Sequence, residues 1–325
     1  MQMLREQDID PSPLLGKRVA IIGFGNQGRA QALNLHDSGI DVVVGLRGGS
    51  STTTEVEGHG LSAALVEDAA ASADVIMLLA PDEILASIYR EIEPVIRPRA
   101  ALGFSHGLAI HFRTIVPRGD LDVFLIAPKG PGTALRSLYR EGRGMIALWA
   151  VAQDASGKAK DIALAYGRAI GCARAGLIAS SFAEECEADL FNEQAVVWGA
   201  VPAILEAGFD TLVAGGISPE VAFLECVGEL KLIAELIEAR GIAGMREAIS
   251  NTAELGAVLG GPAVIDPAIR EKMAVVLESV RSGAFAKTLR SEAENGYPKL
   301  RAARSAARSL PIEQVYATLK KLSED

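Results

Sequence analysis

An alternation of short apolar runs with stretches of helical period is the feature that most constrains the fold of the first half of this chain. Such an alternation is typical of a parallel β-sheet whose two faces are covered by helices. The runs that we expect to form buried strands are residues 19–23, 41–45, 74–80, 101–104, 122–127 and 146–151. A last unit, with the helical stretch SGKAKDIALAYGRAIG followed by ARAGLIA, ends near Ser180. The sequence therefore predicts a doubly wound α/β domain at the N-terminus.

The second half of the chain lacks this alternation. After Ser181 no run has a strand pattern, whereas residues 219–241 have the pattern of one helix, with Ser218 as a possible cap. We predict two domains, an α/β domain over residues 1–180 and an all-helical domain over residues 181–325. A chain of 325 residues, 49% of them hydrophobic, is long enough to build two cores.

Charge and cysteine content argue against several functional classes. The net charge is -9 and the sequence has no basic patch, so binding to nucleic acid or to an anionic membrane is not expected. No apolar run reaches the roughly 18 residues that span a bilayer, and the first residues lack the apolar centre of a signal peptide. Cys172, Cys186 and Cys226 have neither paired nor zinc-type spacing, which favours a reduced, cytoplasmic protein.

A glycine-rich motif follows the first predicted strand and precedes a predicted helix. Its residues are Gly23, Phe24, Gly25, Asn26, Gln27 and Gly28. Glycines in this context let the backbone approach a pyrophosphate, whose charge the helix N-terminus favours. The motif therefore predicts a Rossmann-like dinucleotide site, and a glycine-rich turn without a ligand is the alternative.

The residues after the second predicted strand distinguish the two nicotinamide cofactors. An NAD site usually has an acid here, which binds the ribose hydroxyls. This chain instead has Arg47, Ser50 and Thr52, with no acid before Glu55. A guanidinium and hydroxyls suit a 2′-phosphate, so the segment predicts NADPH, unless it is only a solvated loop.

Two pairs of acidic residues occur at helical spacing in apolar surroundings. Asp189 and Glu193 are four residues apart, as are Glu225 and Glu229, so each pair shares a helix face. Like charges at this spacing repel, and a hard cation such as Mg²⁺ or Mn²⁺ would relieve the repulsion. From the spacing alone, carboxylates that all face water are the more frequent case, so these pairs do not identify a metal site unaided.

Two further candidates follow predicted strands. His106 comes after the run at 101–104, and Lys129 comes after the run at 122–127 within a segment rich in Pro and Gly. Ligands of open α/β sheets bind outside the carboxyl ends of the strands, where a positioned lysine suits an anionic substrate. The alternative is that both are ordinary surface residues.

Ten sequence blocks, in the same order, resemble ketol-acid reductoisomerase (acetohydroxy-acid isomeroreductase) in its short form, from about Leu14 to Val315. The blocks are GNQGRAQALNLHDSG, VVVGLR, PDEI, SHGLAIHF, APKGPG, QDASGKAKDIALAY, EADLFNEQAVV, AGFDTLV, ECVGELKLI and ISNTAELG. The resemblance implies a reaction of branched-chain amino acid biosynthesis. A 2-aceto-2-hydroxy acid loses a hydroxyl proton, an alkyl group migrates, and NADPH delivers hydride to the new ketone.

The resemblance also implies roles for single residues. Asp189 and Glu193 are expected to bind two Mg²⁺ ions, with Asp189 bridging them, and Glu225 and Glu229 are expected from the second subunit of a homodimer or a multiple of dimers. Ser250 is expected to hold the substrate carboxylate. The implied catalytic residues are His106, Lys129, Glu193 and Glu229. The implied cofactor contacts are the glycine motif, Arg47, Ser50, Thr52, Asp82, His106 and Gly132. The helical domain is expected to be knotted.

Some residues depart from the usual pattern of this family. Gly228 stands where a histidine is usual beside Glu229, Asn192 stands where a glycine is usual, and Leu85 stands where a glutamine is frequent. Arg29, Gln31 and Trp198 are further departures. These changes leave open a specialised paralogue that reduces a related 2-keto acid without migration. A cofactor-binding regulator without activity fits less well, because a binding module needs no buried acidic pairs.

Overall fold

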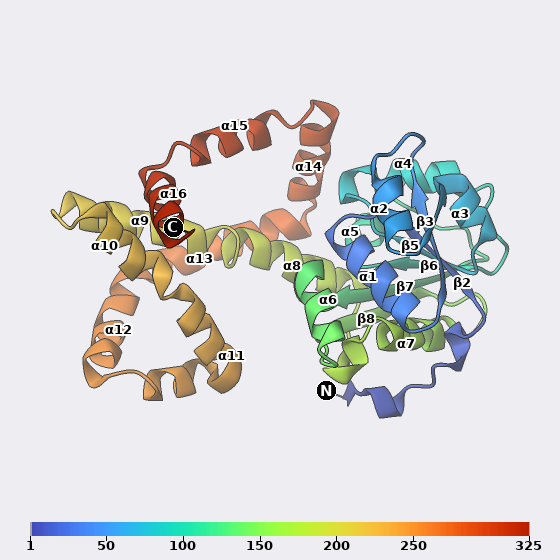
Figure 1. The fold of residues 1–325 in the computed structure, drawn as a ribbon, viewed down its shortest axis with the longest axis horizontal. Helices are drawn as coiled ribbons and strands as arrows, with labels where there is room; N and C mark the ends of the chain where they lie inside the picture. Colours follow the sequence, from blue (N-terminus) through green and yellow to red (C-terminus); the bar gives the residue numbers. More distant parts are fainter. Residues whose placement is uncertain (1, 325) are drawn as a thin grey trace. The chain divides into compact units, whose positions relative to one another are not determined.

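The structure, a computed structural model, describes residues 2–324 and divides into two compact units, Met1–Ala188 and Asp189–Asp325. The first unit is a sheet with helices on both faces, and the described part of the second consists of helices alone (Figure 1). The predicted combination of an α/β domain with a helical domain is confirmed.

A nine-stranded sheet forms the centre of the first unit, with the strand order β1-β9-β8-β7-β6-β5-β2-β3-β4. The strands are β1 (Met3–Leu4), β2 (Arg18–Ile22), β3 (Asp41–Leu46), β4 (Ser62–Leu65), β5 (Val75–Leu78), β6 (Ala101–Phe104), β7 (Asp122–Pro128), β8 (Ala147–Gln153) and β9 (Leu177–Ala179). All six predicted apolar runs form strands. The sheet is parallel from β4 to β7.

Strand β8 departs from the predicted parallel arrangement, because it pairs antiparallel with β7. Pro128 at the end of β7 is opposite Ala147 at the start of β8. The segment between them contains α6 (Gly132–Arg140) and a turn at Gly142, where φ is 72°. Strand β8 thus starts at the same end of the sheet at which β7 stops, and the chain makes no crossover to the opposite end. Strand β9 continues parallel to β8, and β1 closes the sheet antiparallel to β9.

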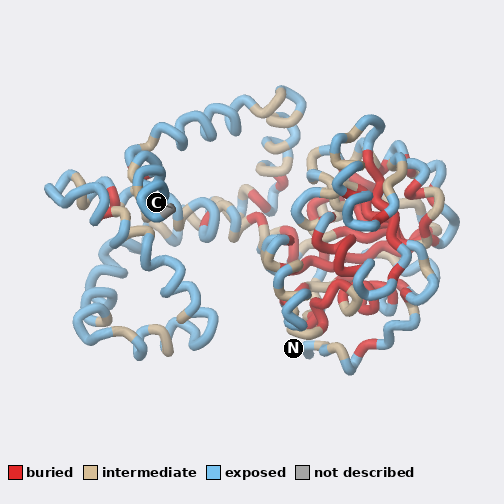
Figure 2. Tube along the Cα trace, viewed as in Figure 1, coloured by how far each residue is buried: buried red, intermediate tan, exposed pale blue. Residues whose placement is uncertain are grey.

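Helices cover both faces of the sheet because alternate strand residues enter two different cores. Val19 and Ile21 of β2 belong to one core, and Ala20 and Ile22 belong to the other. The first core is completed by α1 (Asn26–Asp37), α2 (Thr52–Gly58), α6 and α7 (Ala159–Ala169). The second is completed by α3 (Val66–Ser72), α4 (Asp82–Ile92) and α5 (Leu108–His111). Figure 2 shows the buried residues of this unit concentrated along the strands.

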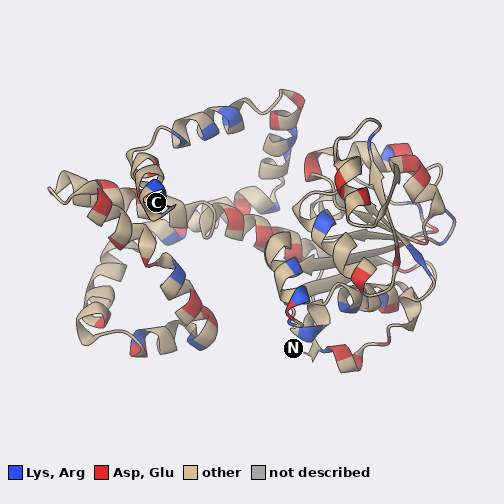
Figure 3. Ribbon diagram, in the orientation of Figure 1, with Lys and Arg blue, Asp and Glu red and all other residues tan. Residues whose placement is uncertain are grey.

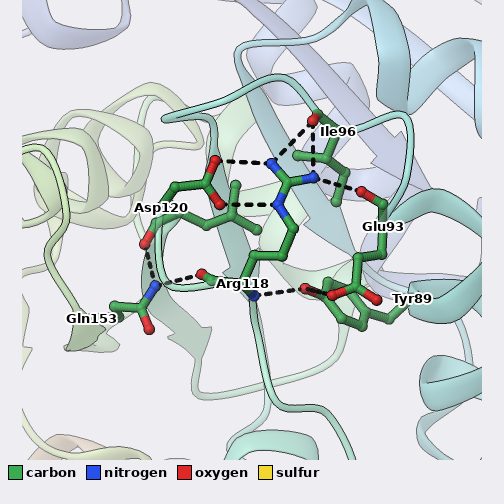
Figure 4. A network of polar contacts seen from close by, with 7 residues as sticks. Tyr89, Glu93, Ile96, Arg118, Asp120 and Gln153 are labelled. Carbon is green, nitrogen blue, oxygen red and sulfur yellow. Dashed lines mark hydrogen bonds and ion pairs between the residues drawn. The ribbon is translucent and has the colours of Figure 1, made fainter.

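Arg118 holds the loop that leads into β7 in place through several hydrogen bonds (Figure 4). The Arg118 guanidinium donates to both carboxylate oxygens of Asp120 and to the carbonyls of Glu93 and Ile96. Its backbone N–H donates to the Tyr89 hydroxyl at 2.9 Å, and its carbonyl accepts from the Gln153 amide at 2.8 Å. All five guanidinium donors are therefore used, at the edge of the sheet where β7 begins.

The second unit begins inside α8 (Phe182–Ala195). Its other helices are α9 (Ala200–Ala214), α10 (Pro219–Phe223), a π-helical turn (Leu224–Gly228), α11 (Leu230–Glu247), α12 (Asn251–Val264), α13 (Pro267–Arg281), α14 (Ala284–Glu294), α15 (Pro298–Ala307) and α16 (Pro311–Glu324). The predicted helix over residues 219–241 is thus interrupted by the π-helical turn, whereas its predicted end at Gly241 coincides with a break in helical geometry, where φ is 68°.

The buried core of the helical unit is small. Phe209 of α9, Ala222 of α10 and Ile312 of α16 pack together, and most other residues of this unit are exposed (Figure 2). Residues Phe182–Ala214, which form α8 and α9, are long and apolar enough to cross a membrane by length and composition alone. The sequence prediction counted only uninterrupted apolar residues and so found no such stretch. Length and composition do not distinguish this stretch from a helix of a soluble protein.

Candidate active site

The glycine motif forms a tight loop between β2 and α1. Gly23 has a φ of 100°, and a methyl group there would lie 3.0 Å from the carbonyl oxygen of Leu79. A methyl group at Gly28 would overlap the carbonyl oxygen of Gly23. Only glycine fits these two positions, so backbone rather than side chains lines the start of α1. Such a backbone cradle at a helix N-terminus fits the pyrophosphate of a dinucleotide.

The loop after β7 packs directly against this motif. The Gln27 amide donates to the carbonyl of Gly130 at 2.8 Å, and the Asn26 side-chain oxygen accepts from the backbone N–H of Thr133 at 2.9 Å. A methyl group at Gly132 would overlap the carbonyl of Asn26. The structure therefore brings Gly132, a predicted cofactor contact, against the glycine motif.

A buried glutamine connects the glycine motif to the loop after β6. The Gln31 amide nitrogen donates to the Gln27 side-chain oxygen at 3.1 Å and to the Ser105 hydroxyl at 2.9 Å. Its oxygen accepts from the Tyr166 hydroxyl at 2.8 Å. Gln31 is fully buried, and its two donors and its acceptor all have partners. Gln31 thus holds Ser105, the residue next to His106, in register with the glycine motif.

The centre of the site is a carboxylate that the sequence prediction did not select. Glu185, in the first turns of α8, has only 1% of its side chain exposed. One of its oxygens is 2.8 Å from the Lys129 ammonium, and the other is 3.0 Å from His106 Nδ1. That second oxygen also accepts from the backbone N–H of Gly107 at 2.8 Å. Glu185 therefore draws together the loops that follow β6 and β7.

The charges of this cluster determine its protonation. Burial raises the pKa of Glu185, but the hydrogen bond from His106 and the positive charges of His106 and Lys129 outweigh burial and lower the pKa to about 2. Burial lowers the pKa of His106, but hydrogen bonds with Cys186 and Glu185 and the negative charges of Glu185 and Asp82 outweigh it, so this pKa lies well above its ordinary value. The cluster at neutral pH is one carboxylate between two cations.

This arrangement suits an anionic substrate. The side chain of Lys129 is 33% exposed and that of His106 is 17% exposed, so neither side chain is fully enclosed by the protein. They lie at the carboxyl ends of parallel strands, which is where open α/β sheets bind their ligands. A protonated His106 and a Lys129 ammonium can each donate a hydrogen bond to a carboxylate or to a developing alkoxide.

The acidic pairs are placed on two helical segments. Asp189, partly buried, and Glu193, exposed, lie on α8, where acidic residues recur along the helix (Figure 3). Glu225 lies in the π-helical turn, and Glu229 follows it; both are exposed. Over residues 2–324, no three of these four carboxylates lie close enough together to hold one ion. The donors of all four residues are carboxylate oxygens, which suit a hard cation.

The other predicted residues lie at element ends. Arg47 is exposed and has no ion-pair partner among residues 2–324, while the Ser50 hydroxyl accepts from the N–H of Thr52, the first residue of α2, at 3.3 Å. Asp82 begins α4, and its charge acts on His106. Ser250 caps α12, and its hydroxyl accepts from the N–H of Ala253 at 3.2 Å.

A sequence signal for Glu185 was available. Glu185, Asp189 and Glu193 are spaced by four residues each, so they continue one helix face. The neighbouring acids Glu184 and Glu187 obscured this signal, because a run of acidic residues usually marks a solvated surface. Only the tertiary contacts of the loops after β6 and β7 single out the buried member.

Comparisons with known proteins agree across both units. Residues 13–176 match the family model for the acetohydroxy acid isomeroreductase NADPH-binding domain, and residues 182–325 match the model for the ketol-acid reductoisomerase C-terminal domain. The structure of an NADH-preferring ketol-acid reductoisomerase from an uncultured archean is similar at 41% sequence identity and a TM-score of 0.96, covering 99% of each chain.

More distant structures share only the fold. A semialdehyde dehydrogenase NAD-binding protein from Cupriavidus necator is similar at 19% identity and a TM-score of 0.62, covering 82% of this chain and 99% of that one. A pyrroline-5-carboxylate reductase from Coxiella burnetii is similar at 16% identity and a TM-score of 0.56, covering 83% and 98%.

Proposed function

The chain belongs to the ketol-acid reductoisomerase family, so it isomerises and reduces 2-aceto-2-hydroxy acids of the acetolactate type, and we propose here which residues carry the two steps. The family places the reaction in branched-chain amino acid biosynthesis, with a small-molecule substrate. The observation that carries the proposal is the buried Glu185 carboxylate held between His106 and Lys129 beside the cofactor loop.

We propose that His106 and Lys129 bind the charged oxygens of the substrate. Glu185 fixes both cations and, because it stays ionised, keeps His106 protonated, so His106 acts as a donor rather than as a base. The hydroxyl proton of the substrate therefore needs another acceptor, and we propose Glu229 for this role, with Ser250 as a ligand of the substrate carboxylate.

We propose that Asp189 and Glu193 hold Mg²⁺, and that Glu225 and Glu229 of a second copy complete the site. Two bound ions would polarise the carbonyl and hydroxyl oxygens of the substrate during migration. The carboxylate-only donor sets support this assignment, since Mg²⁺ prefers oxygen ligands. Activity that persists unchanged after exhaustive chelation would exclude it.

For the cofactor, we propose NADPH. Arg47 is an exposed cation at the end of β3, with the hydroxyls of Ser50 and Thr52 after it and no acid between them. A relative at 41% identity is NADH-preferring, so both cofactors must be titrated. Arg47→Ala should weaken NADPH binding and spare NADH, and equal wild-type affinities for the two cofactors would contradict the proposal.

We further propose a homodimer, or a multiple of dimers, in which a second copy covers the helical unit. Large apolar side chains of α11 and α12 are exposed in the single chain, as is Val275 of α13, and large exposed apolar surfaces are typical of interfaces. The knotted path of the helical domain stays a prediction. A cytoplasmic location is proposed from the unpaired state of all three cysteines.

One assay tests the central proposal. Oxidation of NADPH is followed with 2-acetolactate, with and without Mg²⁺, and in parallel with 3-hydroxy-3-methyl-2-ketobutyrate, which needs reduction only. We expect turnover of both substrates, with the migration step lost in metal-free buffer. Turnover of the second substrate alone in the presence of Mg²⁺ would show an enzyme that reduces without migration.

A further inference from the structure

We infer that Arg29 and Glu55 together form a specificity determinant for the phosphate end of the cofactor, because Arg29 neutralises the acid closest in sequence to the proposed phosphate segment. The inference rests on the proposed binding of a 2′-phosphate by Arg47, Ser50 and Thr52. It concerns two residues outside that segment, one on each of the first two helices of the α/β unit.

The geometry joins α1 to α2 near their N-terminal ends. Arg29 directly follows the last glycine of the cofactor motif, and its Nη1 is 3.0 Å from the Glu55 carboxylate. Its Nη2 is 3.2 Å from His59 Nε2, at the C-terminal end of α2. One side chain of α1 thus contacts the first turn of α2, at Glu55, and its C-terminal cap, at His59.

The position of Glu55 explains why this contact matters. Glu55 is the first acidic residue after the end of β3, and it lies in the first turn of α2. Glu55 is three residues after Thr52, so the two share a helix face. A carboxylate near the end of this strand is the feature that selects NAD, because it accepts hydrogen bonds from the ribose hydroxyls and repels a 2′-phosphate.

Arg29 removes that preference by pairing with the carboxylate. The ion pair occupies Glu55 and cancels its charge, so Arg47 and the hydroxyls act on the phosphate without an opposing anion. Half of the Arg29 side chain and 44% of the Glu55 side chain are exposed, so solvent screens the pair. The expected effect is therefore small, about twofold to fivefold in relative affinity.

A double-mutant cycle tests this inference in the full-length protein. Dissociation constants of NADPH and NADH are measured by fluorescence titration at low salt for the wild type, Arg29→Gln, Glu55→Gln and the double variant. We expect Arg29→Gln to shift the ratio of the two constants toward NADH by about twofold to fivefold. In the Glu55→Gln background, Arg29→Gln should not change the ratio further. The shift should shrink as salt is added.

The exposed pair of Arg18 and Asp41 is a matched control. It has a comparable exposure and a separation of 2.7 Å, and it lies where β2 and β3 begin rather than where they end. Arg18→Gln should leave the cofactor ratio unchanged. If it shifts the ratio as much as Arg29→Gln does, a general charge effect explains the result and the inference fails.

Two further outcomes would overturn the inference. If Arg29→Gln changes nothing, Glu55 has no influence on the cofactor. If Arg29→Gln shifts the ratio equally in both backgrounds, Arg29 contacts the phosphate itself and does not act through Glu55. A wild type that prefers NADH refutes the proposed cofactor instead. The change in ratio on Arg29→Gln is still measured in that case and decides the inference separately.

Discussion

The two units of this protein bury their apolar residues to very different extents. The α/β unit encloses a core on each face of its sheet, whereas the described residues of the helical unit bury a small cluster around Phe209. Leu259 is 68% exposed and Val275 is 70% exposed in the helical unit. A unit with so little core cannot offset the entropy of ordering its helices by itself. The α/β unit is therefore expected to be stable as a single chain, and the helical unit only with another polypeptide.

The largest expected effect is a loss of turnover on substitution of Asp189, a proposed metal ligand in the helical unit. Asp189→Asn should lower the turnover of 2-acetolactate about a thousandfold, because an amide is a poorer ligand than a carboxylate for the Mg²⁺ that we propose Asp189 would hold. Binding of the cofactor should not change, since the glycine motif lies in the α/β unit. Steady-state kinetics and fluorescence titration measure the two quantities. The control is Glu184→Gln on the same helix, and an equal loss in both variants would argue against a specific role of Asp189.

A smaller effect is expected on the acid stability of the α/β unit. The pKa of Glu185 is lowered to about 2 from 4.5, so its contribution is present above about pH 4.5 and is lost as the pH falls toward 2. This contribution is roughly 3 kcal/mol. The raised pKa of His106 acts in the opposite direction, since its contribution is complete below about pH 6.5 and is lost as the pH rises through the raised value.

Tryptophan fluorescence can assign this pH dependence to one unit. The chain has two tryptophans, Trp149 in β8 and Trp198 in the helical unit. In a Trp198→Phe background, denaturant titrations between pH 3 and 6 follow the α/β unit alone. Glu185→Gln should flatten the loss of stability at low pH, and Glu184→Gln should not. An unchanged slope in Glu185→Gln would mean that the cluster does not hold the carboxylate ionised.

The different stabilities expected for the two units can be tested by measuring unfolding at several protein concentrations. With Trp198 as the only tryptophan, the free energy of unfolding of the helical unit should rise by about 1.4 kcal/mol for each tenfold increase in protein concentration, as expected for a dimer. With Trp149 as the only tryptophan, the α/β unit should show no such dependence. Concentration-independent unfolding of both units would refute the idea that a second copy completes the helical core.

The smallest effect is expected at Gly228. A methyl group there would lie 3.8 Å from Leu224 Cδ2, an ordinary contact, so Gly228→Ala is tolerated sterically. Alanine should stabilise the helical unit by up to about 1 kcal/mol, since glycine is a poor helix former. Because Gly228 ends the π-helical turn that carries Glu225, we also expect kcat/KM for 2-acetolactate to change relative to that for 2-aceto-2-hydroxybutyrate. An unchanged ratio of the two values would remove position 228 from substrate selection.

The α/β unit was largely predictable because its signals are local. Apolar runs and a glycine motif directly after a strand identify strands and turns without knowledge of the fold. Strands β1 and β4 escaped prediction because they have two and four residues and are not buried apolar runs. The antiparallel direction of β8 was not predicted either, because a helix between two strands usually marks a crossover between parallel strands.

The candidate site was predictable only in part, for a physical reason. Spacing indicates which carboxylates share a helix face, but burial depends on what packs against that face. Among the acids of α8, Glu185 is buried because the loops carrying Gly107 and Lys129 close over it. Similarly, the i to i+4 spacing of Glu225 and Glu229 predicts an α-helix, whereas the structure has a π-helical turn there. Neither the burial of Glu185 nor the π-helical turn can be read from one short stretch of sequence.

The Arg118 cluster has a consequence for the timescale on which its loop opens. The segment between α5 and β7 has no regular secondary structure, so it would ordinarily exchange its amide hydrogens quickly. Here the amide of Arg118 is bonded to Tyr89, and the guanidinium ties the loop to the end of α4 at Glu93 and Ile96. Opening the loop requires breaking all of these bonds together. The amide of Arg118 should therefore exchange about as slowly as those of the neighbouring strand β7, and its deuterium uptake would report global unfolding of the α/β unit.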